Sequence, residues 1–254
     1  MTKVSDIASF LEEHIPSSMK EDYDNVGLLC GFPDREVTRI LVVLDITLEA
    51  IREAASMDAE LIVSHHPLIF TPMRRITDDT PDGKRVIELL RGGISAICLH
   101  TNLDRVEGGV NSALADALGA EMEELLDMGG VCRLNESMSM EAFLAQTRDA
   151  LNAPDIRFYS AGRPVERIAV CGGAGGDIIY AAAETGCDTV LTGEIKHHQW
   201  IDGAQLGLNL IEGSHFATEN VVTPVLTELL RGKYPEIDVC QSCFQGQLSR
   251  GFEF

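Results

Sequence analysis

The sequence predicts an α/β protein made of two α/β lobes, each of which contains a βαβ unit. Short apolar runs alternate with helical patterns along the 254 residues, which is typical of parallel strands joined by helices. Two segments, 39–66 and 167–194, can be laid over each other without a gap. Polar residues follow the last strand of each segment, at the sheet edge where α/β proteins usually keep their chemistry.

The charge balance excludes several classes of partner. Forty acidic residues against twenty basic ones give a net charge of −20. Phosphate backbones are bound by clustered Lys and Arg, so we expect no direct binding to nucleic acid, and the same charge disfavours anionic membranes. The chain contains no apolar run near the roughly 20 residues of a membrane span, and its start lacks a signal peptide's apolar core. We therefore expect a soluble, cytoplasmic protein.

The seven cysteines suit a reducing compartment. An odd number argues against a full disulfide framework, and Cys98, Cys171 and Cys187 lie in apolar segments, as buried thiols do. Cys240 and Cys243 form one C-x-x-C motif. Because no second such motif accompanies it, a structural zinc or redox role is the less favoured interpretation.

The first half of the chain gives its elements in a regular order. Residues 1–16 have the pattern of an amphipathic helix. The segment 39–66 then gives a strand, a turn, a helix and a second strand. A helix over PDGKRVIELLRGG and a short strand over ISAICLH follow it.

The second half repeats this order after a boundary. Paired glycines and Asn-Glu-Ser in LLDMGGVCRLNESMSM indicate the boundary, and a helix is expected between an N-cap at Ser139 and Pro154. IRFYS and VERIAV, on either side of AGRP, predict a hairpin. The second βαβ unit, a helix over KHHQWIDGAQLG and a strand over LNLIE come next. A last helix and strand, in VVTPVLTELLRGKYPEIDVCQS, are expected to return to the first lobe.

These elements divide the chain into two lobes. The first is expected to span residues 1–126 and to be completed by 214–254, and the second to span 127–213. Ile40 falls on Ile168 and Val63 on Leu191 when the two βαβ segments are superposed. Chance similarity between βαβ units remains the alternative, but a structural pseudo-duplication is favoured.

The run LIVSHHPLIF carries the first candidate site. Pro67 has no backbone N–H and stops the strand, so His65 and His66 lie at its C-terminal edge. One surface histidine beside one packed histidine is the ordinary alternative. In the superposition of the two halves, Glu194 takes the position of His66, so both halves end their second strand in a ligand-type residue.

Two further clusters follow later strands. HTNLD supplies Asp104, although Asn102 and Asp104 could equally cap a helix. SHFATE supplies His215 and Glu219, which lie four residues apart and so share one helix face; a simple surface pair is the alternative.

Together these clusters offer three imidazoles and two carboxylates. That number suits two metal ions with a bridging carboxylate and open positions for water. Mixed nitrogen and oxygen donors favour Zn, Mn or Fe, with Ni and Mg less favoured. The predicted fold is therefore two α/β lobes of related βαβ topology that face a metal-containing cleft.

Other polar residues are weaker candidates. In TGEIKHH, Glu194 and His198 are expected to act as acid–base groups or substrate contacts, with hydrogen bonding to ligands or a helix start as the alternative. Arg74 and Arg75 follow SHHPLIF and are the candidates to contact an anionic substrate. His100 is expected to be structural, orienting the loop of Asp104.

The glycine-rich stretch CGGAGGD, residues 171–177, lies before an expected helix. It lacks the G-x-G-x-x-G register and the lysine of a P-loop, so a dinucleotide or P-loop site is excluded. Its glycines would still permit the close approach of a helix or a ligand.

The motifs together resemble the Nif-three-like dinuclear-metal family, often labelled GTP cyclohydrolase I type 2. The matching pieces are YDNVGLL, SHHPLIF, HTNLD, TGEIKHH and SHFATE, in family order and spacing over essentially the whole chain. No large insertion separates the lobes, as in the short form of the family. The resemblance implies that the metal ligands are His65, His66, Asp104, His215 and Glu219. It also implies a ring-shaped homohexamer, a trimer of dimers, with the metal sites facing its interior.

Two functions remain open at this stage. The first is a metal-dependent hydrolase of a nucleotide or another small phosphorylated or heterocyclic substrate; the family label implies GTP. The second is a non-catalytic role as a metal-binding or metal-delivery protein, or as a toroidal scaffold for a protein partner. Metal binding needs only the five ligands, whereas catalysis also needs an open coordination position and a substrate pocket.

Overall fold

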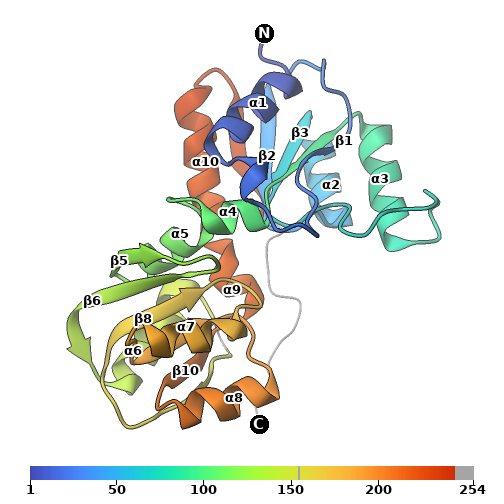
Figure 1. Cartoon of the computed structure of the whole chain (residues 1–254). Coiled ribbons are helices and arrows are strands. Elements are labelled where there is room, and N and C mark those ends of the chain that lie inside the picture. Colours follow the sequence, from blue (N-terminus) through green and yellow to red (C-terminus); the bar gives the residue numbers. More distant parts are fainter. Residues whose placement is uncertain (154, 244–254) are drawn as a thin grey trace. The chain divides into compact units, whose positions relative to one another are not determined.

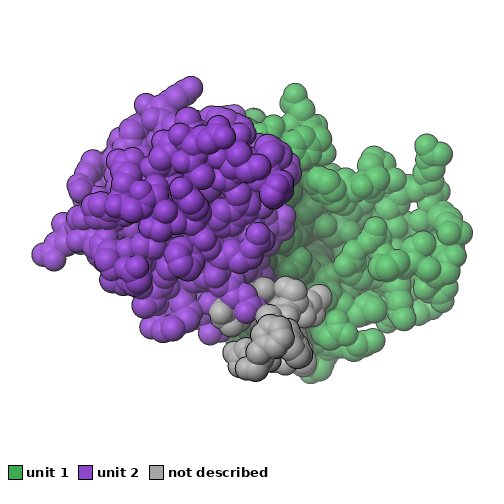
Figure 2. Space-filling model, turned by 90° about the horizontal axis from the view of Figure 1, so that it is seen from below, with its two compact units in different colours: residues 1–106, 223–245 green, residues 107–222, 246–254 purple. Residues whose placement is uncertain are grey.

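The computed structural model of the protein describes residues 1–153 and 155–243. They form two compact units, which Figure 2 shows in different colours. The first comprises Met1–Val106 together with the described residues from Thr223 onward, and the second comprises Glu107–Val222. Each unit has its own sheet and its own core.

The sheet of the first unit is mostly parallel. Its strand order is β1-β4-β3-β2-β11, with β1 antiparallel to β4 at one edge. The strands are β1 (Gly27–Cys30), β2 (Arg39–Val43), β3 (Leu61–Ser64), β4 (Ser95–Cys98) and β11 (Asp238–Gln241). Because β2, β3 and β4 run in the same direction, their carboxyl ends meet at one edge.

Helices cover both faces of this sheet (Figure 1). They are α1 (Val4–His14), α2 (Leu48–Ser56), α3 (Pro81–Gly92) and α10 (Val222–Lys233), with the short α4 (Thr101–Arg105) and a 3-10 turn, η1 (Ser17–Met19). Leu41, Val43 and Ile62 pack with α2 and α3 on one face. The intervening strand residues point to the opposite face, as the two-residue period of a strand requires.

Local sequence signals set the ends of these helices. Thr47 caps α2 by accepting a hydrogen bond from the backbone N–H of Ala50. Thr80 caps α3 in the same way, Pro81 occupies its first turn, and Gly93 ends it with a φ of 64°. The capped helices bring the chain back to the start of the next strand, which is what a right-handed βαβ crossover needs.

The second unit contains a mixed sheet. Its strand order is β5-β6-β8-β9-β10-β7, in which β8, β9 and β10 are parallel. The strands are β5 (Ala120–Leu125), β6 (Gly130–Met138), β7 (Arg157–Tyr159), β8 (Val165–Cys171), β9 (Thr189–Thr192) and β10 (Asn209–Glu212). The helices are α5 (Val110–Ala117), α6 (Met140–Leu151), α7 (Ile179–Glu184), α8 (His197–Gln205) and α9 (His215–Asn220), with a 3-10 turn, η2 (Gly176–Ile178).

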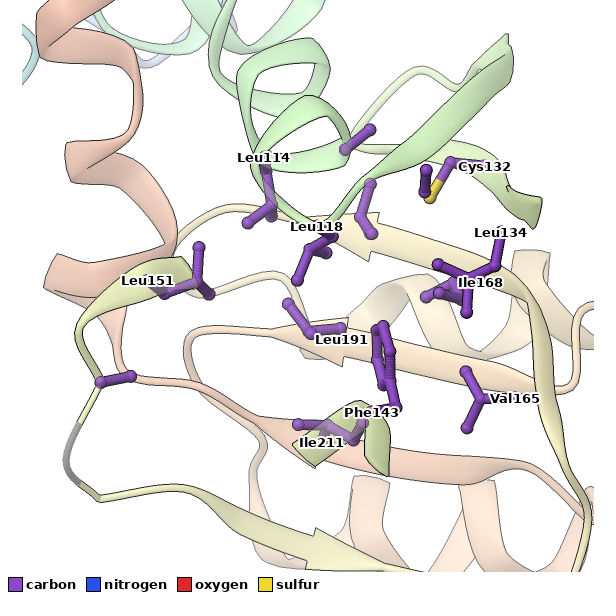
Figure 3. Close-up of a cluster of buried hydrophobic side chains, with 14 of the residues drawn as sticks. Leu114, Leu118, Cys132, Leu134, Phe143, Leu151, Val165, Ile168, Leu191 and Ile211 are labelled. Atoms are coloured by element: carbon purple, nitrogen blue, oxygen red, sulfur yellow. The ribbon is translucent and has the colours of Figure 1, made fainter. Parts of the chain in front are cut away.

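The core of this unit lies on the two faces of its sheet. Figure 3 shows one face, where Phe143 of α6 packs among Val165, Leu191 and Ile211. The expected helix over this region is confirmed, because Ser139 accepts a hydrogen bond from the N–H of Ala142 and so caps α6. Residues of α7 pack on the opposite face with alternate strand residues. Burial on both faces explains why these strands have apolar runs rather than strict alternation.

The two βαβ segments repeat each other in their hydrogen bonds. Arg39 donates through Nη1 to the carbonyl of Met57, and Arg167 donates through Nη1 to that of Thr185. The carboxylate of Glu60 accepts from the N–H of Arg39, and that of Asp188 accepts from the N–H of Arg167. Glu60 corresponds to Asp188 in the gapless superposition. These bonds support the predicted pseudo-duplication.

The tail returns to the first unit, as expected, where β11 pairs in parallel with β2. The predicted hairpin is wrong, however. β7 pairs with β10 at the far edge of the sheet, because β8 already has β6 and β9 as its two neighbours.

The division between units also differs from the expected one at residue 126. It lies between Val106 and Glu107, because α5 and β5 belong with β6 to the second unit.

No helix in the described ranges is long and apolar enough to cross a membrane. Five of the seven cysteines, among them Cys98, Cys171 and Cys187, are buried and in the thiol form, as the sequence suggested. Burial raises the pKa of the Cys98 thiol to about 11, so this group stays protonated at neutral pH. Cys240 is half-buried and Cys243 is exposed, and both are also thiols.

Candidate metal centre

The histidine pair of the first unit continues the parallel pairing of the sheet beyond β3. The N–H of His65 donates to the carbonyl of Val43 at 3.3 Å, and that of His66 donates to the carbonyl of Leu44 at 2.9 Å. Pro67 follows directly and ends the pairing. Both imidazoles therefore lie on ordered backbone at the carboxyl edge of the sheet.

His65 is completely buried. Its Nδ1 lies 2.9 Å from the carbonyl oxygen of Leu99, which can only accept a hydrogen bond. The ring proton is therefore on Nδ1 and the lone pair is on Nε2. That Nε2 atom lies 3.8 Å from Oδ1 of Asp104, which α4 carries.

His66 is oriented by a carboxylate. Its Nδ1 lies 2.7 Å from Oδ1 of Asp45, which follows the end of β2. A carboxylate that accepts from one ring nitrogen fixes the tautomer and raises the basicity of the other nitrogen, as is usual for metal-binding histidines. The position of Asp45 beside His66 follows from the parallel pairing of β2 with β3.

His100 follows β4 and is held in the same manner. Its Nδ1 lies 2.8 Å from Oδ1 of Asp24, and Oδ2 of Asp24 accepts from the N–H of Thr101 at 3.0 Å and from its hydroxyl at 2.5 Å. Burial alone would raise the pKa of Asp24, but the hydrogen bonds from His100 and Thr101 outweigh it and hold that pKa well below its usual range. Asp24 is therefore a buried carboxylate that stays ionised.

The three imidazoles converge. One ring nitrogen from each of His65, His66 and His100 lies within 4.8 Å of the others. The hydrogen bonds at Nδ1 make Nε2 the nitrogen that carries the lone pair in each ring. Three such nitrogens are a donor set that Zn and other borderline divalent metals accept. The first unit therefore contains a group that could hold a metal ion.

The second unit presents a matching pair on α9. His215 and Glu219 are one helical turn apart, with Nε2 of His215 at 3.1 Å from Oε2 of Glu219. Nδ1 of His215 lies 2.7 Å from Oε1 of Glu194, which follows β9. At Nδ1, His215 thus repeats the arrangement of His66, in which a carboxylate holds this nitrogen.

The glycine-rich loop after β8 lets α9 approach the sheet. A Cβ atom at Gly173, where φ is 63°, would collide with Oε1 of Glu219, and one at Gly193 would lie 2.7 Å from Cα of His215. The glycines therefore serve the close approach of the helix that carries His215 and Glu219. Ser214, the N-cap of α9, has a φ of 73°, a strained conformation of the kind found beside functional residues.

The remaining predicted site residues have different surroundings. Glu194 contacts His215, as described above. His198 is exposed on the first turn of α8 and belongs to neither group of metal-ligand type found among the described residues. Arg74 and Arg75 are exposed in the loop before α3, and Arg75 forms an ion pair with Asp79 at 3.3 Å.

Sequence reasoning treated His100 as structural and did not assign Asp24 or Asp45. A signal for His100 was available, because it follows β4 as His65 follows β3, and the two strands are parallel neighbours. Asp24 lies within YDNVGLL, which entered the argument as a motif without a chemical role. Its contact with His100 joins residues 76 positions apart and could not be derived from local pattern.

Comparisons with known proteins find relatives over nearly the whole chain. A family model described as Duf34/NIF3 (NGG1p interacting factor 3) matches residues 2–246. A relative from Clostridium perfringens, named "GTP cyclohydrolase 1 type 2 homolog", is 34% identical over 227 residues, which cover 85% of this chain and 87% of the relative. A relative of the same name from Clostridium acetobutylicum is 30% identical over 241 residues, covering 91% and 90%.

Solved structures show the same fold. Staphylococcus aureus protein SA1388 aligns with a TM-score of 0.94 at 29% identity, over 99% of both chains. Reduced HcgD from Methanocaldococcus jannaschii aligns with a TM-score of 0.82 at 27% identity, over 96% of this chain and 98% of that one.

Proposed function

The chain belongs to the Duf34/NIF3 family, and from that premise we propose that it is a dinuclear metal-binding protein that acts as a metal-dependent hydrolase. The proposed substrate is a nucleotide or another small phosphorylated or heterocyclic compound. The names of the curated relatives support this class, since they are called homologs of a GTP cyclohydrolase.

One observation carries the proposal: one ring nitrogen from each of His65, His66 and His100 lies within 4.8 Å of the others. In each of these rings Nδ1 lies against an acceptor oxygen, so Nε2 is the nitrogen suited to a metal. A histidine that only packs in a core has no reason to gather with two others in this way. Metal-binding histidines do, and an acceptor at the second nitrogen orients the ring and strengthens the ligand.

The residues present fit a divalent transition metal. Imidazole nitrogens with carboxylate oxygens suit Zn, Mn or Fe better than the oxygen cages of Ca or Mg. The family resemblance assigns both ions to one set of ligands, and we keep that assignment as part of the proposal. The set is His65, His66, Asp104, His215 and Glu219. When bound, such ions supply Lewis acidity, which polarises a substrate group and lowers the pKa of water.

The chain's own residues would then position and move protons. Glu194 keeps its Oε1 on His215, and its second oxygen would accept a proton from a substrate or water within reach. His198, exposed at the start of α8, is the proposed second acid–base group. Arg74 and Arg75 would attract an anionic substrate to the first unit, because they are exposed and positively charged.

A metal-dependent turnover assay tests the proposal. The wild type, depleted of metal and reloaded with Zn, Mn or Fe, is incubated with GTP and other nucleotides, and products are followed by chromatography. We expect turnover that depends on metal, and Glu194→Gln should keep its metal but lose roughly 10²- to 10⁴-fold in rate, the usual range for an acid–base group. Gln is suitable because its Oε1 can still accept from His215.

If metal-loaded wild type turns over no nucleotide, the hydrolase proposal fails. The non-catalytic alternative, a metal-binding or metal-delivery protein or a scaffold for a partner, then remains. If turnover is present and Glu194→Gln does not change it, Glu194 acts only by orienting His215. Arg75→Ala, which removes an exposed charge, should raise KM rather than lower kcat if this residue attracts an anion.

A further inference from the structure

Two exposed aromatic rings lie beside the imidazoles of the first unit. Tyr23 is 65% exposed and Phe70 is 49% exposed. Their ring centroids are 6.2 Å apart and the planes meet at 75°, an edge-to-face contact. The ring of Phe70 also lies 5.9 Å from that of His100, at 87°. Phe70 therefore joins an exposed aromatic surface to the imidazole group.

The backbone under these rings is fixed, although the rings themselves are exposed. Tyr23 precedes Asp24, whose buried carboxylate is bonded to His100 and Thr101. Phe70 follows Ile69, whose carbonyl accepts a hydrogen bond of 2.6 Å from the side-chain amide of Asn25. Residues 23–25 and the segment before Phe70 are thus tied to each other and to the imidazole group. Rings held in this way can bind without first being ordered.

Exposed apolar side chains that gather in one patch mark contacts with ligands or partners, whereas single exposed side chains are ordinary. The neighbouring imidazoles and Asp104 make this region polar on one side and aromatic on the other, which suits a ligand with a flat ring and hydrogen-bonding edges. Burial, together with the charges of Glu21 and Asp24, raises the pKa of Tyr23. Its phenol is therefore neutral at physiological pH and can donate a hydrogen bond to such an edge.

We propose that Tyr23 and Phe70 form an aromatic platform that binds a planar heteroaromatic ring of the substrate next to the histidine group, with one side chain against the face of that ring and the other against its edge. This inference rests on the proposed function for the role of the ring as part of the substrate. The platform adds to the proposed function the residues that would select a compound with a heteroaromatic ring over a sugar phosphate that has none. Stacking tolerates different rings, because every base has a π-face.

Calorimetry with two probes tests the platform. Guanosine 5′-monophosphate carries a purine ring, and ribose 5-phosphate is the same sugar phosphate without it. We expect wild type to bind the first at least about ten times more tightly. Phe70→Leu and Tyr23→Leu keep apolar volume and remove the π-face, so each should weaken binding of the nucleotide by roughly 5- to 100-fold, the range for one stacked base, and leave that of ribose 5-phosphate unchanged.

Two further variants separate stacking from general damage. Phe70→Trp keeps an aromatic face and should retain nucleotide binding. Phe32→Leu removes another exposed aromatic ring of the same unit, at 42% exposure, and should change neither affinity. Metal content and thermal unfolding of each variant show that it is folded.

Three results would overturn the inference. One is equal affinity of wild type for both probes, including no measurable binding of either. Another is unchanged nucleotide affinity in Phe70→Leu and Tyr23→Leu. The third is a change in sedimentation mass in those variants with nucleotide affinity retained, which would make the surface a contact between subunits.

Metal content of the wild type is measured on the same samples. Bound metal with failed stacking refutes only the platform, whereas absent metal refutes the proposed function independently of the two probes.

Discussion

Asp24 is a residue whose position in the sequence gives no sign of its role. In the structure it is buried, and its carboxylate orients His100 of the imidazole group. Its carboxylate is buried and accepts hydrogen bonds from His100 and from the backbone and hydroxyl of Thr101. A buried carboxylate is unfavourable unless such donors compensate it. Here they do so strongly enough to lower its pKa, so the ionised form stabilises the fold.

The lowered pKa predicts a pH dependence of stability. The folded pKa of Asp24 lies below the ordinary value of 3.8, so its contribution is complete above about pH 4 and is lost as the pH falls below that value. We expect Asp24→Asn to reduce the free energy of unfolding by about 1–3 kcal/mol at pH 7, the range for a hydrogen-bonded charged group. The difference from wild type should shrink between pH 4 and pH 3. Urea unfolding at several pH values measures it.

Asp22→Asn is the matched control, since Asp22 is exposed two residues away. It should change the free energy of unfolding by less than about 0.5 kcal/mol at every pH. An Asp24→Asn protein as stable as wild type at pH 7 would show that the carboxylate does not stabilise the fold.

Single residues were predictable from sequence where the signal was local. His65 and His66 precede a proline at the end of an apolar run, so their place at a strand edge could be derived. His215 and Glu219 were placed on one helix face from their spacing alone, and they are on α9. The roles of the hydrogen-bond acceptors were not predictable, because Asp24, Asp45 and Glu194 contact their histidines across long sequence separations.

Among the elements, the loop after β8 shows how backbone geometry serves a site. The spacing of its glycines does not match a nucleotide-binding fingerprint. From the sequence alone, one could infer only that a helix or a ligand comes close to this loop. The structure identifies two approaching helices, since a Cβ atom at Gly173 would collide with Glu219 of α9 and one at Gly172 with Val110 of α5. The loop is thus part of the support of the candidate ligands in the second unit.

This support can be tested with two glycines that differ in one respect. Gly173 and Gly162 both have positive φ, of 63° and 74°, but only a Cβ at Gly173 would meet other atoms. Both substitutions by Ala carry backbone strain, whereas only Gly173→Ala should displace Glu219. We expect Gly173→Ala to weaken metal binding by at least about ten-fold and Gly162→Ala to leave it unchanged, as measured by metal titration. Equal affinities in the two variants would refute a role of this loop in holding α9.

Elements joined by short connections were predicted well, and distant pairing was not. Both βαβ segments and the return of the tail to the first unit were anticipated, because alternating patterns and parallel crossovers restrict the choices. The predicted hairpin is wrong because strands that follow each other in the sequence need not pair. Here β8 already has β6 and β9 as its two neighbours. The pairing of β7 with β10 depends on the completed sheet, which local turn signals do not encode.

For the whole molecule, assembly remains a prediction from the family resemblance. A homohexamer would give a sedimentation mass about six times the 27.7 kDa of one chain. With a net charge of −20, we expect acidic residues to be spread over the outer surface and subunit contacts to use apolar and neutral segments. Sedimentation equilibrium at micromolar concentration checks this. A single monomeric mass would contradict the hexamer.

The central claim is that the adjacent histidines after β3 hold metal, and elemental analysis tests it most directly. We expect wild type to contain up to two transition-metal ions per chain and the double variant His65→Ala/His66→Ala to lose at least one. The control is His197→Ala/His198→Ala, which removes another adjacent pair, exposed at the start of α8. It should keep the metal content of the wild type. Full metal occupancy in the His65→Ala/His66→Ala protein would contradict the claim.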